Sequence, residues 1–312
     1  MNAQPLVSIA LCTYNGEEFL KEQLDSLIAQ TYRNLEIIVV DDCSTDSTIG
    51  ILSEYADQHP LIQLFRNEKN LGYTQNFEKA LRLCKGEFIA ICDQDDIWLP
   101  EKISLQVDAI KTNLLIYHDS EFIDAQGGAM GLRISDKFNF YRGSDPTVFL
   151  YLNCISGHSI LMKSSLLKAA LPFPVGFHYD QWLAFIAAFT GSVDHLEKCL
   201  VKYRQHDKNS TDILAKKPGL RQRSNAKKIA GLIGESDWLN LCNIKTNQYE
   251  KGLIHSLYVL SVKRNDSFIS LAYGWKIWKH KAQLLYLLKK PNLSKLFFTL
   301  RKTWGVPAKK LF

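Results

Sequence analysis

The first hundred residues alternate short, continuously apolar runs with amphipathic segments, and this alternation restricts the possible folds more than any other feature. Four apolar runs have the length of buried strands and lie at residues 6–11, 35–40, 61–65 and 87–92. The segment between the first two carries Leu20, Leu24, Leu27 and Ile28 on one helical face. Strands that are apolar throughout and separated by helices are typical of a parallel sheet covered on both faces. We therefore predict an α/β fold with a Rossmann-like, mostly parallel sheet flanked by helices.

A polar cluster follows three of these four strands directly. The clusters read CTYNG, DDCSTD and DQDD after the first, second and fourth runs. Because parallel strands bring their carboxyl ends to one edge of the sheet, and ligands bind at that edge, we expect the three clusters to converge on one site.

The third cluster concentrates three carboxylates, Asp93, Asp95 and Asp96, directly after an apolar run. Like charges this close repel, and a carboxylate beside an apolar core is costly to desolvate unless a cation meets it. One interpretation is a solvated acidic turn that caps the helix expected at Pro100. The other is a divalent cation site, because Mg²⁺ and Mn²⁺ prefer a few carboxylates together with phosphate oxygens. An acidic pair at a strand end then predicts a metal–diphosphate site.

The first two clusters have a structural and a functional interpretation. Tyr14 and Asn15 fit turn chemistry before a helix, and Asp41 and Asp42 fit a helix cap. Alternatively, an aromatic ring and a carboxylate at adjacent strand ends hold a nucleobase, the ring by stacking and the carboxylate by accepting a hydrogen bond. The sequence contains neither GxGxxG nor GxxxxGK[ST], which argues against a dinucleotide-binding loop and a P-loop.

Charge divides the chain into two parts, which we predict to be two domains, 1–212 and 213–312. Residues 213–312 hold 20 Lys and Arg against 4 Asp and Glu, whereas residues 1–212 hold 18 against 28. The basic part is aromatic and helical in pattern, which favours a helix lying on an anionic membrane surface. A packed helical subdomain, a dimer interface and nucleic-acid binding are the alternatives, the last without any recognition motif to support it.

Three further features concern location. The seven cysteines include no CxxC pair, which is typical of a reducing compartment. The start, MNAQPLVSIAL, has no basic region followed by an apolar one, and no run approaches the roughly 18 apolar residues of a spanning helix. The expected location is cytoplasmic, with peripheral contact at the inner face of the membrane.

Three blocks together resemble the nucleotide-sugar-binding half of glycosyltransferase family 2, which has the GT-A fold. They are VSIALCTYNGEEFLKEQLDSLIAQTYRNLEIIVVDDCSTDST, NEKNLGYTQNFEKAL and GEFIAICDQDDIWLPEK. The resemblance is dense over residues 6–110 and thinner over 111–212. The segments DQDDIWLP, HYDQWLA and YRQH further resemble bacterial rhamnosyltransferase-like members that build surface polysaccharides.

The resemblance assigns roles to residues of this sequence. It implies that seven residues face the nucleotide sugar: Cys12, Tyr14, Asn15, Asp41, Asp42, Asp93 and Arg204. It implies that Mg²⁺ or Mn²⁺ is held by Asp95, Asp96 and His206. Arg204 and His206 are also compatible with ordinary surface positions.

The resemblance also implies a base and an acceptor pocket. Asp180, at the start of HYDQWLA, matches the carboxylate that takes the proton of the acceptor hydroxyl, a role that contributes roughly 10²–10⁴-fold in rate. An ordinary helix N-cap is the other interpretation of Asp180. His158 and Trp182 are expected to line the acceptor pocket, and core packing is the alternative for Trp182.

The implied function is an inverting, metal-dependent glycosyl transfer from a nucleotide-diphosphate sugar, with rhamnose as the first candidate. The implied acceptor is a hydroxyl of a glycan or a lipid-linked glycan, and a homo-oligomer stays open. Two alternatives remain. A sugar-1-phosphate nucleotidyltransferase would carry a Gly-rich loop with Arg or Lys after the first strand, for which TYNGEEFLKE is a poor match. A non-catalytic nucleotide-sugar-binding or scaffold protein would be expected to lack one of the acidic clusters, and all are present.

Overall fold

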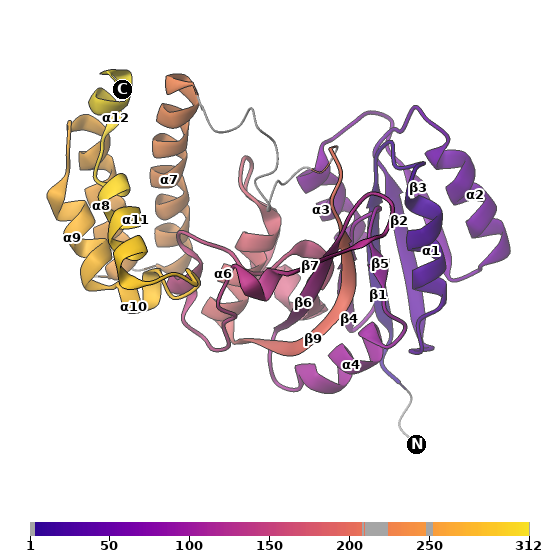
Figure 1. Cartoon of the computed structure of the whole chain (residues 1–312). Coiled ribbons are helices and arrows are strands. Elements are labelled where there is room, and N and C mark those ends of the chain that lie inside the picture. Colours follow the sequence, from indigo (N-terminus) through magenta and orange to yellow (C-terminus); the bar gives the residue numbers. More distant parts are fainter. Residues whose placement is uncertain (1–3, 208, 210–223, 248–251, 312) are drawn as a thin grey trace. The chain divides into compact units, whose positions relative to one another are not determined.

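The computed structural model describes residues 4–207, 209, 224–247 and 252–311 (Figure 1). The chain forms two compact units, Met1–Pro146 with Asn153–His206, and Thr147–Leu152 with Asp207–Phe312. The domain boundary predicted at residue 212 lies outside the described residues.

The first half of the first unit is a parallel sheet. Its strands are β1 (Val7–Thr13), β2 (Leu35–Asp41), β3 (Ile62–Arg66) and β4 (Phe88–Cys92). β1 lies between β2 and β4, and β3 continues the sheet beyond β2, all in parallel. Thr13 lies opposite Asp41, and Leu11 lies opposite Cys92, so the three strands end at one edge. The four predicted strands and their convergence are confirmed.

The second half of the unit makes the sheet mixed. The order is β3-β2-β1-β4-β8-β6-β9-β5, and β7 pairs with β6. The added strands are β5 (Ile97–Trp98), β6 (Leu115–Ile123), β7 (Ala129–Arg133), β8 (Leu161–Lys163) and β9 (Val193–Arg204). β8 is antiparallel to β4, and β9 runs parallel to β6 and antiparallel to β5. This arrangement brings the end of β9 beside the segment that follows β4. There Arg204 N donates a hydrogen bond to Asp96 Oδ1, although the two residues are 108 positions apart in the sequence.

Helices cover this sheet, and their apolar faces supply the core. They are α1 (Leu20–Ile28), α2 (Thr48–Gln58), α3 (Tyr73–Leu83), α4 (Lys102–Ile110), α5 (Leu167–Ala170) and α6 (Tyr179–Thr190). Short 3-10 helices of this unit are η1 (Ile134–Asp136), η3 (Gly157–Ser159) and η4 (Ser164–Leu166), whereas η2 (Pro146–Phe149) lies almost entirely in the second unit. On the predicted apolar face of α1, Leu20, Leu24 and Leu27 are fully buried in one core cluster with residues of β1 and β2, and Ile28 is partly buried. Burial of such side chains stabilises each by roughly 1.5–3 kcal/mol.

The second unit is helical. Its helices are α7 (Asn225–Thr246), α8 (Leu253–Asp266), α9 (Leu271–Lys279), α10 (Lys281–Leu284), α11 (Asn292–Lys302) and α12 (Val306–Leu311). Ser224 and Ser270 cap α7 and α9 by accepting hydrogen bonds from backbone N–H groups of the first turn. Among the residues that the structure describes, no helix is both long and apolar enough to cross a membrane.

A buried ion-pair network ties the helices of the second unit together. Glu235 of α7 accepts hydrogen bonds from Arg264 of α8, Tyr273 of α9 and Lys302 of α11. Tyr273 in turn contacts Tyr151 at 3.0 Å between the hydroxyl oxygens. Burial acts to raise the pKa of Glu235, but Lys302 and Arg264 outweigh it and hold the pKa below 4.5. One carboxylate therefore compensates two cations inside the helical unit.

Replacement of Glu235 with Ala is expected to destabilise the helical unit by about 3–5 kcal/mol, because the fully buried Arg264 loses its counter-charge. The exposed Asp237, two residues away on α7, supplies the control, and Asp237→Ala should change stability by less than about 0.5 kcal/mol. Because the pKa of Glu235 is lowered in the folded state, its contribution to the free energy of unfolding should be complete above pH 4.5. The contribution should decrease below pH 4.5 and be lost as the pH falls through the lower folded-state pKa. Urea unfolding of the full chain, followed by circular dichroism, measures both effects, and equal losses in the two variants would contradict the prediction.

Candidate functional site

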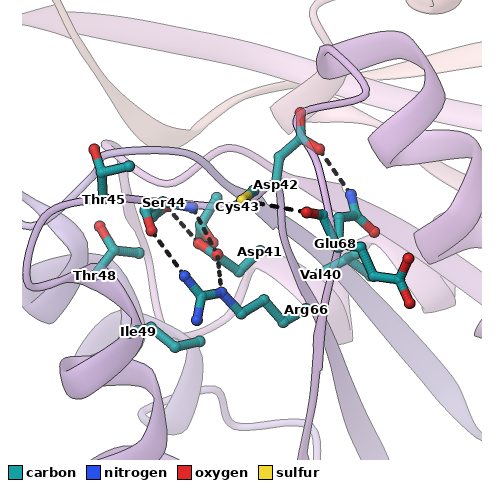
Figure 2. Close-up of polar contacts among 12 residues, drawn as sticks. Val40, Asp41, Asp42, Cys43, Ser44, Thr45, Thr48, Ile49, Arg66 and Glu68 are labelled. Carbon is teal, nitrogen blue, oxygen red and sulfur yellow. Dashed lines mark hydrogen bonds and ion pairs between the residues drawn. The ribbon is translucent and has the colours of Figure 1, made fainter.

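Asp41, at the end of β2, is fully buried and anchors the loop that follows it (Figure 2). Its Oδ1 accepts hydrogen bonds from Thr13 Oγ1 at 3.0 Å and from Ser44 Oγ at 2.5 Å. Its Oδ2 accepts from Ser44 N at 2.9 Å and lies 3.7 Å from Arg66 Nε. Figure 2 shows Arg66 reaching from β3 towards Asp41 and the Ser44 carbonyl. The structure thus gives Asp41 protein partners, and its predicted contact with the nucleotide stays a prediction.

Asp42 organises a second loop, residues 67–72, at the same edge of the sheet. Its Oδ1 accepts from Asn67 Nδ2 at 2.7 Å and from Leu71 N at 2.8 Å, and its Oδ2 accepts from Gly72 N at 2.9 Å. Asn67 was not singled out from the sequence, although the turn-rich segment NEKNLG carries a signal for such a loop.

An open hollow of about 430 Å³ lies beside these anchors, lined by Cys43, Arg66, Asn67 and Glu68. Cys43 has a positive φ of 64°. Its thiol points to the Glu68 carbonyl (Figure 2). The hollow is open to the surface and lies beside the ends of β2 and β3, where Asp41 and Asp42 hold the loops.

The loop after β1 is fastened to the other two clusters. Gln94, the uncharged residue of DQDD, accepts from Tyr14 N at 2.8 Å and donates to Tyr14 O at 3.1 Å. Asn15, with a φ of 47°, accepts from Thr45 N at 2.9 Å. At Gly16 a Cβ would lie 2.3 Å from Gln94 Oε1, so a larger residue there would displace the Gln94 amide from Tyr14. The sequence analysis did not single out Gln94, because the three neighbouring carboxylates suggested a metal site and nothing in the pattern indicated a role for the amide.

The predicted nucleotide-facing residues of this loop differ in exposure. Cys12 is buried at the end of β1, whereas 47% of Tyr14 is exposed. Burial raises the pKa of the Cys12 thiol well above its ordinary value, so the thiol is neutral.

Asp93, Asp96 and His158 form a group that could hold a metal ion, since one ligand atom from each lies within 4.8 Å of the others. His158 Nδ1 lies 3.3 Å from Asp96 Oδ2 and 3.8 Å from Asp93 Oδ2. The other ring nitrogen of His158 contacts Ser120 Oγ at 2.9 Å, which fixes the ring. The sequence predicted His158 for the acceptor pocket; the structure places it under the DQDD loop.

Asp96 is fully buried, and this burial tests whether a cation fits. Its Oδ1 accepts from Arg204 N at 3.0 Å, whereas its Oδ2 lies 3.3 Å from His158 Nδ1 without forming a hydrogen bond to any described residue. Burial, with repulsion from Asp95 and Asp93, raises the pKa of Asp96 well above its ordinary value. Two carboxylates and one imidazole are a suitable ligand set for Mn²⁺, and a cation would satisfy the orphaned oxygen. The residues present therefore fit a divalent cation.

Asp95 and His206 form a second pair of possible ligands beside this group. Asp95 Oδ2 lies 2.8 Å from His206 Nε2, and both side chains retain some exposure. The predicted metal set of Asp95, Asp96 and His206 is thus divided: Asp96 lies beside His158, and Asp95 lies beside His206.

Arg204 is almost completely buried and clasps the DQDD loop from the end of β9. Its Nε donates to Asp95 O at 2.9 Å, and its two terminal nitrogens donate to Ala125 O at 2.9 Å and to Glu22 Oε2 at 2.5 Å. Its guanidinium also lies 4.7 Å from the centre of the Phe19 ring. The sequence predicted that Arg204 assists phosphates; the structure shows a guanidinium engaged by the protein, so the phosphate contact stays a prediction.

Asp180 begins α6, and its carboxylate is partly buried. Burial raises the pKa of Asp180 to about 6, with a further rise from Asp93, while His178 and the N–H of Gln181 act in the opposite direction. A carboxylate with this pKa is a stronger base than an exposed one and is ionised at neutral pH.

Trp182, two residues further along α6, lies in the core. Its Nε1 donates to Ala170 O at 2.8 Å, and its ring stacks with Phe185. The structure therefore gives Trp182 a packing role, and its contact with an acceptor stays a prediction.

Comparison with known proteins identifies the family. Residues 8–169 match the family described as glycosyl transferase family 2. The chain belongs to glycosyltransferase family 2. The matched residues include the β1, β2 and β4 ends and His158 but stop before Asp180, Arg204 and His206.

Two relatives of this family-2 chain illustrate the similarity. The chain is 30% identical to an uncharacterized glycosyltransferase of Rickettsia typhi over 217 residues, which cover 67% of the chain. The match spans 66% of the Rickettsia protein, just under two thirds of its length. The chain is 28% identical to an uncharacterized glycosyltransferase of Haemophilus influenzae over 236 residues, which cover 72% of each.

Solved structures share the fold at low identity. S. aureus TarS 1–349 in complex with UDP-GlcNAc is 18% identical with a TM-score of 0.58, and the match covers 95% of this chain and 82% of TarS. The mannosyltransferase PcManGT of Pyrobaculum calidifontis, in complex with GDP-Man and Mn²⁺, is 16% identical with a TM-score of 0.53, and the match covers 96% and 80%. The predicted GT-A fold is confirmed.

Replacement of Arg204 with Lys is expected to destabilise the first unit by about 2–4 kcal/mol, because an ammonium cannot reproduce the buried fork that donates to the Asp95 and Ala125 carbonyls and to Glu22. Glu22→Gln is the matched control, since 58% of the Glu22 side chain is exposed and its ion pair contributes less than about 1 kcal/mol. Urea unfolding of the full chain measures both. A loss in the control as large as in Arg204→Lys would show that the ion pair, rather than the clasp on the DQDD loop, carries the effect.

Proposed function

We propose that this family-2 chain is an inverting, metal-dependent glycosyltransferase. It would move a sugar from a nucleotide-diphosphate donor to a hydroxyl of a glycan or lipid-linked glycan. The observation that carries the proposal is the convergence of Asp93, Asp96 and His158 at the carboxyl edge of the parallel sheet. Because the chain belongs to glycosyltransferase family 2, we interpret this edge as the site of the sugar donor. The chemistry is assigned to the domain 1–212.

The donor would lie along the edge formed by the ends of β1, β2 and β4. The exposed ring of Tyr14 offers a stacking surface, and the hollow beside Asp41 and Asp42 offers a recess for the base and ribose. Asp93, with 35% of its side chain exposed, would be the most accessible member of the metal group, because Asp96 and His158 are buried. The diphosphate then reaches the DQDD loop, where a cation offsets the repulsion between carboxylates and phosphates.

The divalent cation, Mg²⁺ or Mn²⁺, would be held by Asp93, Asp96 and His158, with Asp95 and His206 as the adjacent pair. When bound, it supplies a Lewis acid that stabilises negative charge on the diphosphate. The protein positions this charge through Arg204 and Ser120, which fix the backbone of the DQDD loop and the ring of His158.

Asp180 would act as the general base. Its carboxylate takes the proton from the acceptor hydroxyl, the acceptor oxygen forms a bond to the anomeric carbon, and the bond from that carbon to the phosphate oxygen breaks. The nucleoside diphosphate leaves with the bonding pair, and attack from the opposite face inverts the configuration. General-base help of this kind contributes roughly 10²–10⁴-fold.

The finer assignments rest on sequence resemblance alone. Rhamnose from dTDP-rhamnose is the first candidate donor, and surface polysaccharide synthesis at the inner face of the cytoplasmic membrane is the proposed setting. The structurally similar proteins were solved with UDP-GlcNAc and with GDP-Man, so a panel of nucleotides is needed to find the donor class.

A single nucleoside diphosphate from the set UDP, dTDP, GDP and CDP should raise the melting temperature of the purified chain, and Mn²⁺ or Mg²⁺ should enlarge the rise. Asp93→Asn should abolish the metal-dependent part, because it removes one ligand and leaves the fold intact at a half-exposed position. The variants His158→Gln and His206→Gln identify the ligand set. Only substitution of a residue that binds the ion should weaken Mn²⁺ binding, as measured by electron paramagnetic resonance. Absence of any nucleotide-dependent shift in folded protein would favour a scaffold role.

Asp180→Asn should lower kcat roughly 10²–10⁴-fold with little change in donor binding. In the wild type kcat should fall as the pH drops through about 6, because the base must be ionised and its pKa is about 6. Asp108→Asn, at an exposed position on α4, is the control and should retain full activity. A pH profile unchanged by the Asp180 substitution would assign the base to another group.

A further inference from the structure

Helix α11 of the second unit turns its apolar stripe outward. Leu293, Phe297 and Leu300 recur at helical spacing and therefore share one face, yet they are 63%, 56% and 44% exposed. The positions buried instead are threonines, Thr299 within the helix and Thr303 just after it. A helix that only needed to complete a core would bury its leucines and expose its threonines.

The threonine side of α11 packs on α9 at a glycine. A Cβ on Gly274 would lie 2.4 Å from Thr303 Cγ2 and 3.8 Å from Thr299 Cγ2, so the helices approach closely there. The two hydroxyls donate to carbonyls of their own helix, Lys295 O and Leu300 O, which leaves the methyl groups to face α9. This packing is complete without the outer stripe.

Helix α9 buries Tyr273 and Ile277 but also exposes large apolar side chains. Leu271 and Trp275 are 68% and 67% exposed, and Trp278 follows on the same face. In both helices a basic residue comes directly after the third apolar position, Lys279 in α9 and Arg301 in α11. Two packed helices thus expose apolar stripes with cationic flanks.

The charge around these stripes has one sign. Residues 267–312 contain ten Lys and Arg and no Asp or Glu. A second copy of the same face would set this positive charge against itself, which counts against a symmetric dimer. Nucleic acid would accept the charge but not the exposed Leu, Phe and Trp side chains, whereas an anionic bilayer accepts both: apolar side chains enter the acyl boundary and lysines stay at the headgroups.

We propose that the outer faces of α9 and α11 form a docking surface for an anionic lipid membrane. The surface consists of Leu271, Trp275, Trp278, Leu293, Phe297 and Leu300, with Lys279 and Arg301 at the flanks. It lies in the helical unit and goes beyond the proposed glycosyl transfer, because lipid binding requires neither donor nor metal.

Co-sedimentation of the full chain with vesicles tests the proposal. Vesicles of phosphatidylcholine with about a third phosphatidylglycerol should bind the protein, neutral phosphatidylcholine vesicles should bind it weakly, and salt should reduce the binding. The double variant Trp275→Ser, Phe297→Ser should lower the partition coefficient roughly tenfold or more, and Lys279→Gln with Arg301→Gln should weaken binding to anionic vesicles only. The control Ile244→Ser, Val262→Ser removes similarly exposed apolar residues from α7 and α8 and should bind as the wild type does.

The following results would overturn the proposal. They are no binding of the wild type to anionic vesicles, equal loss in the control variant, and a concentration-dependent dimer without lipid that only the Trp275 and Phe297 variant abolishes. Nucleic-acid binding that replaces vesicle binding would count in the same way. The nucleotide-induced thermal shift should persist in every variant, so a failure of membrane binding and a failure of the proposed glycosyl transfer are distinguished by separate readouts.

Discussion

Burial of the Asp96 carboxylate at the end of β4 is the constraint on which the site depends. A carboxylate without exposure must be compensated, and the backbone N–H of Arg204 provides part of that compensation. The rest falls to His158 and, in our proposal, to a divalent cation. For Arg204 and His158 to reach Asp96, the ends of β9 and the η3 turn must lie beside β4, which is what the mixed half of the sheet achieves. The extension beyond the four parallel strands therefore completes the acidic site.

Several carboxylates at this edge serve the loops rather than an open ligand surface. Asp41 and Asp42 accept hydrogen bonds from backbone and side-chain donors that hold the loops after β2 and β3. Their burial makes them poor candidates for direct movement on ligand binding, because any shift would leave those donors unpaired. The recess they frame is consequently rigid, and adaptable contacts fall to exposed groups such as Tyr14.

The helical unit combines an internal ion-pair network with exposed apolar and basic residues. Glu235 offsets two cations in its interior, so the excess of lysine and arginine is left for the surface. The Thr299 and Gly274 contact then allows α11 to pack closely without its leucines. Internal charge compensation and small-residue packing together release an apolar and cationic surface for a partner, which explains how a compact helical unit can retain large exposed aromatic residues.

The sequence by itself determined the four parallel strands, the α1 and α3 helices and the convergence of CTYNG, DDCSTD and DQDD, because these follow from local hydrophobic period and from the geometry of parallel strands. It also carried the family, through three blocks with fixed spacing. Only the tertiary structure decided which partners meet. Asp96 is set beside His158, Asp95 beside His206, Arg204 turns inward to clasp a loop 109 residues away, and Gln94 joins two loops. The outward stripe of α11 was equally hidden, since an amphipathic pattern shows that a helix has two faces but not which one the core receives. Pair identities depend on contacts between distant segments, and no local pattern encodes them.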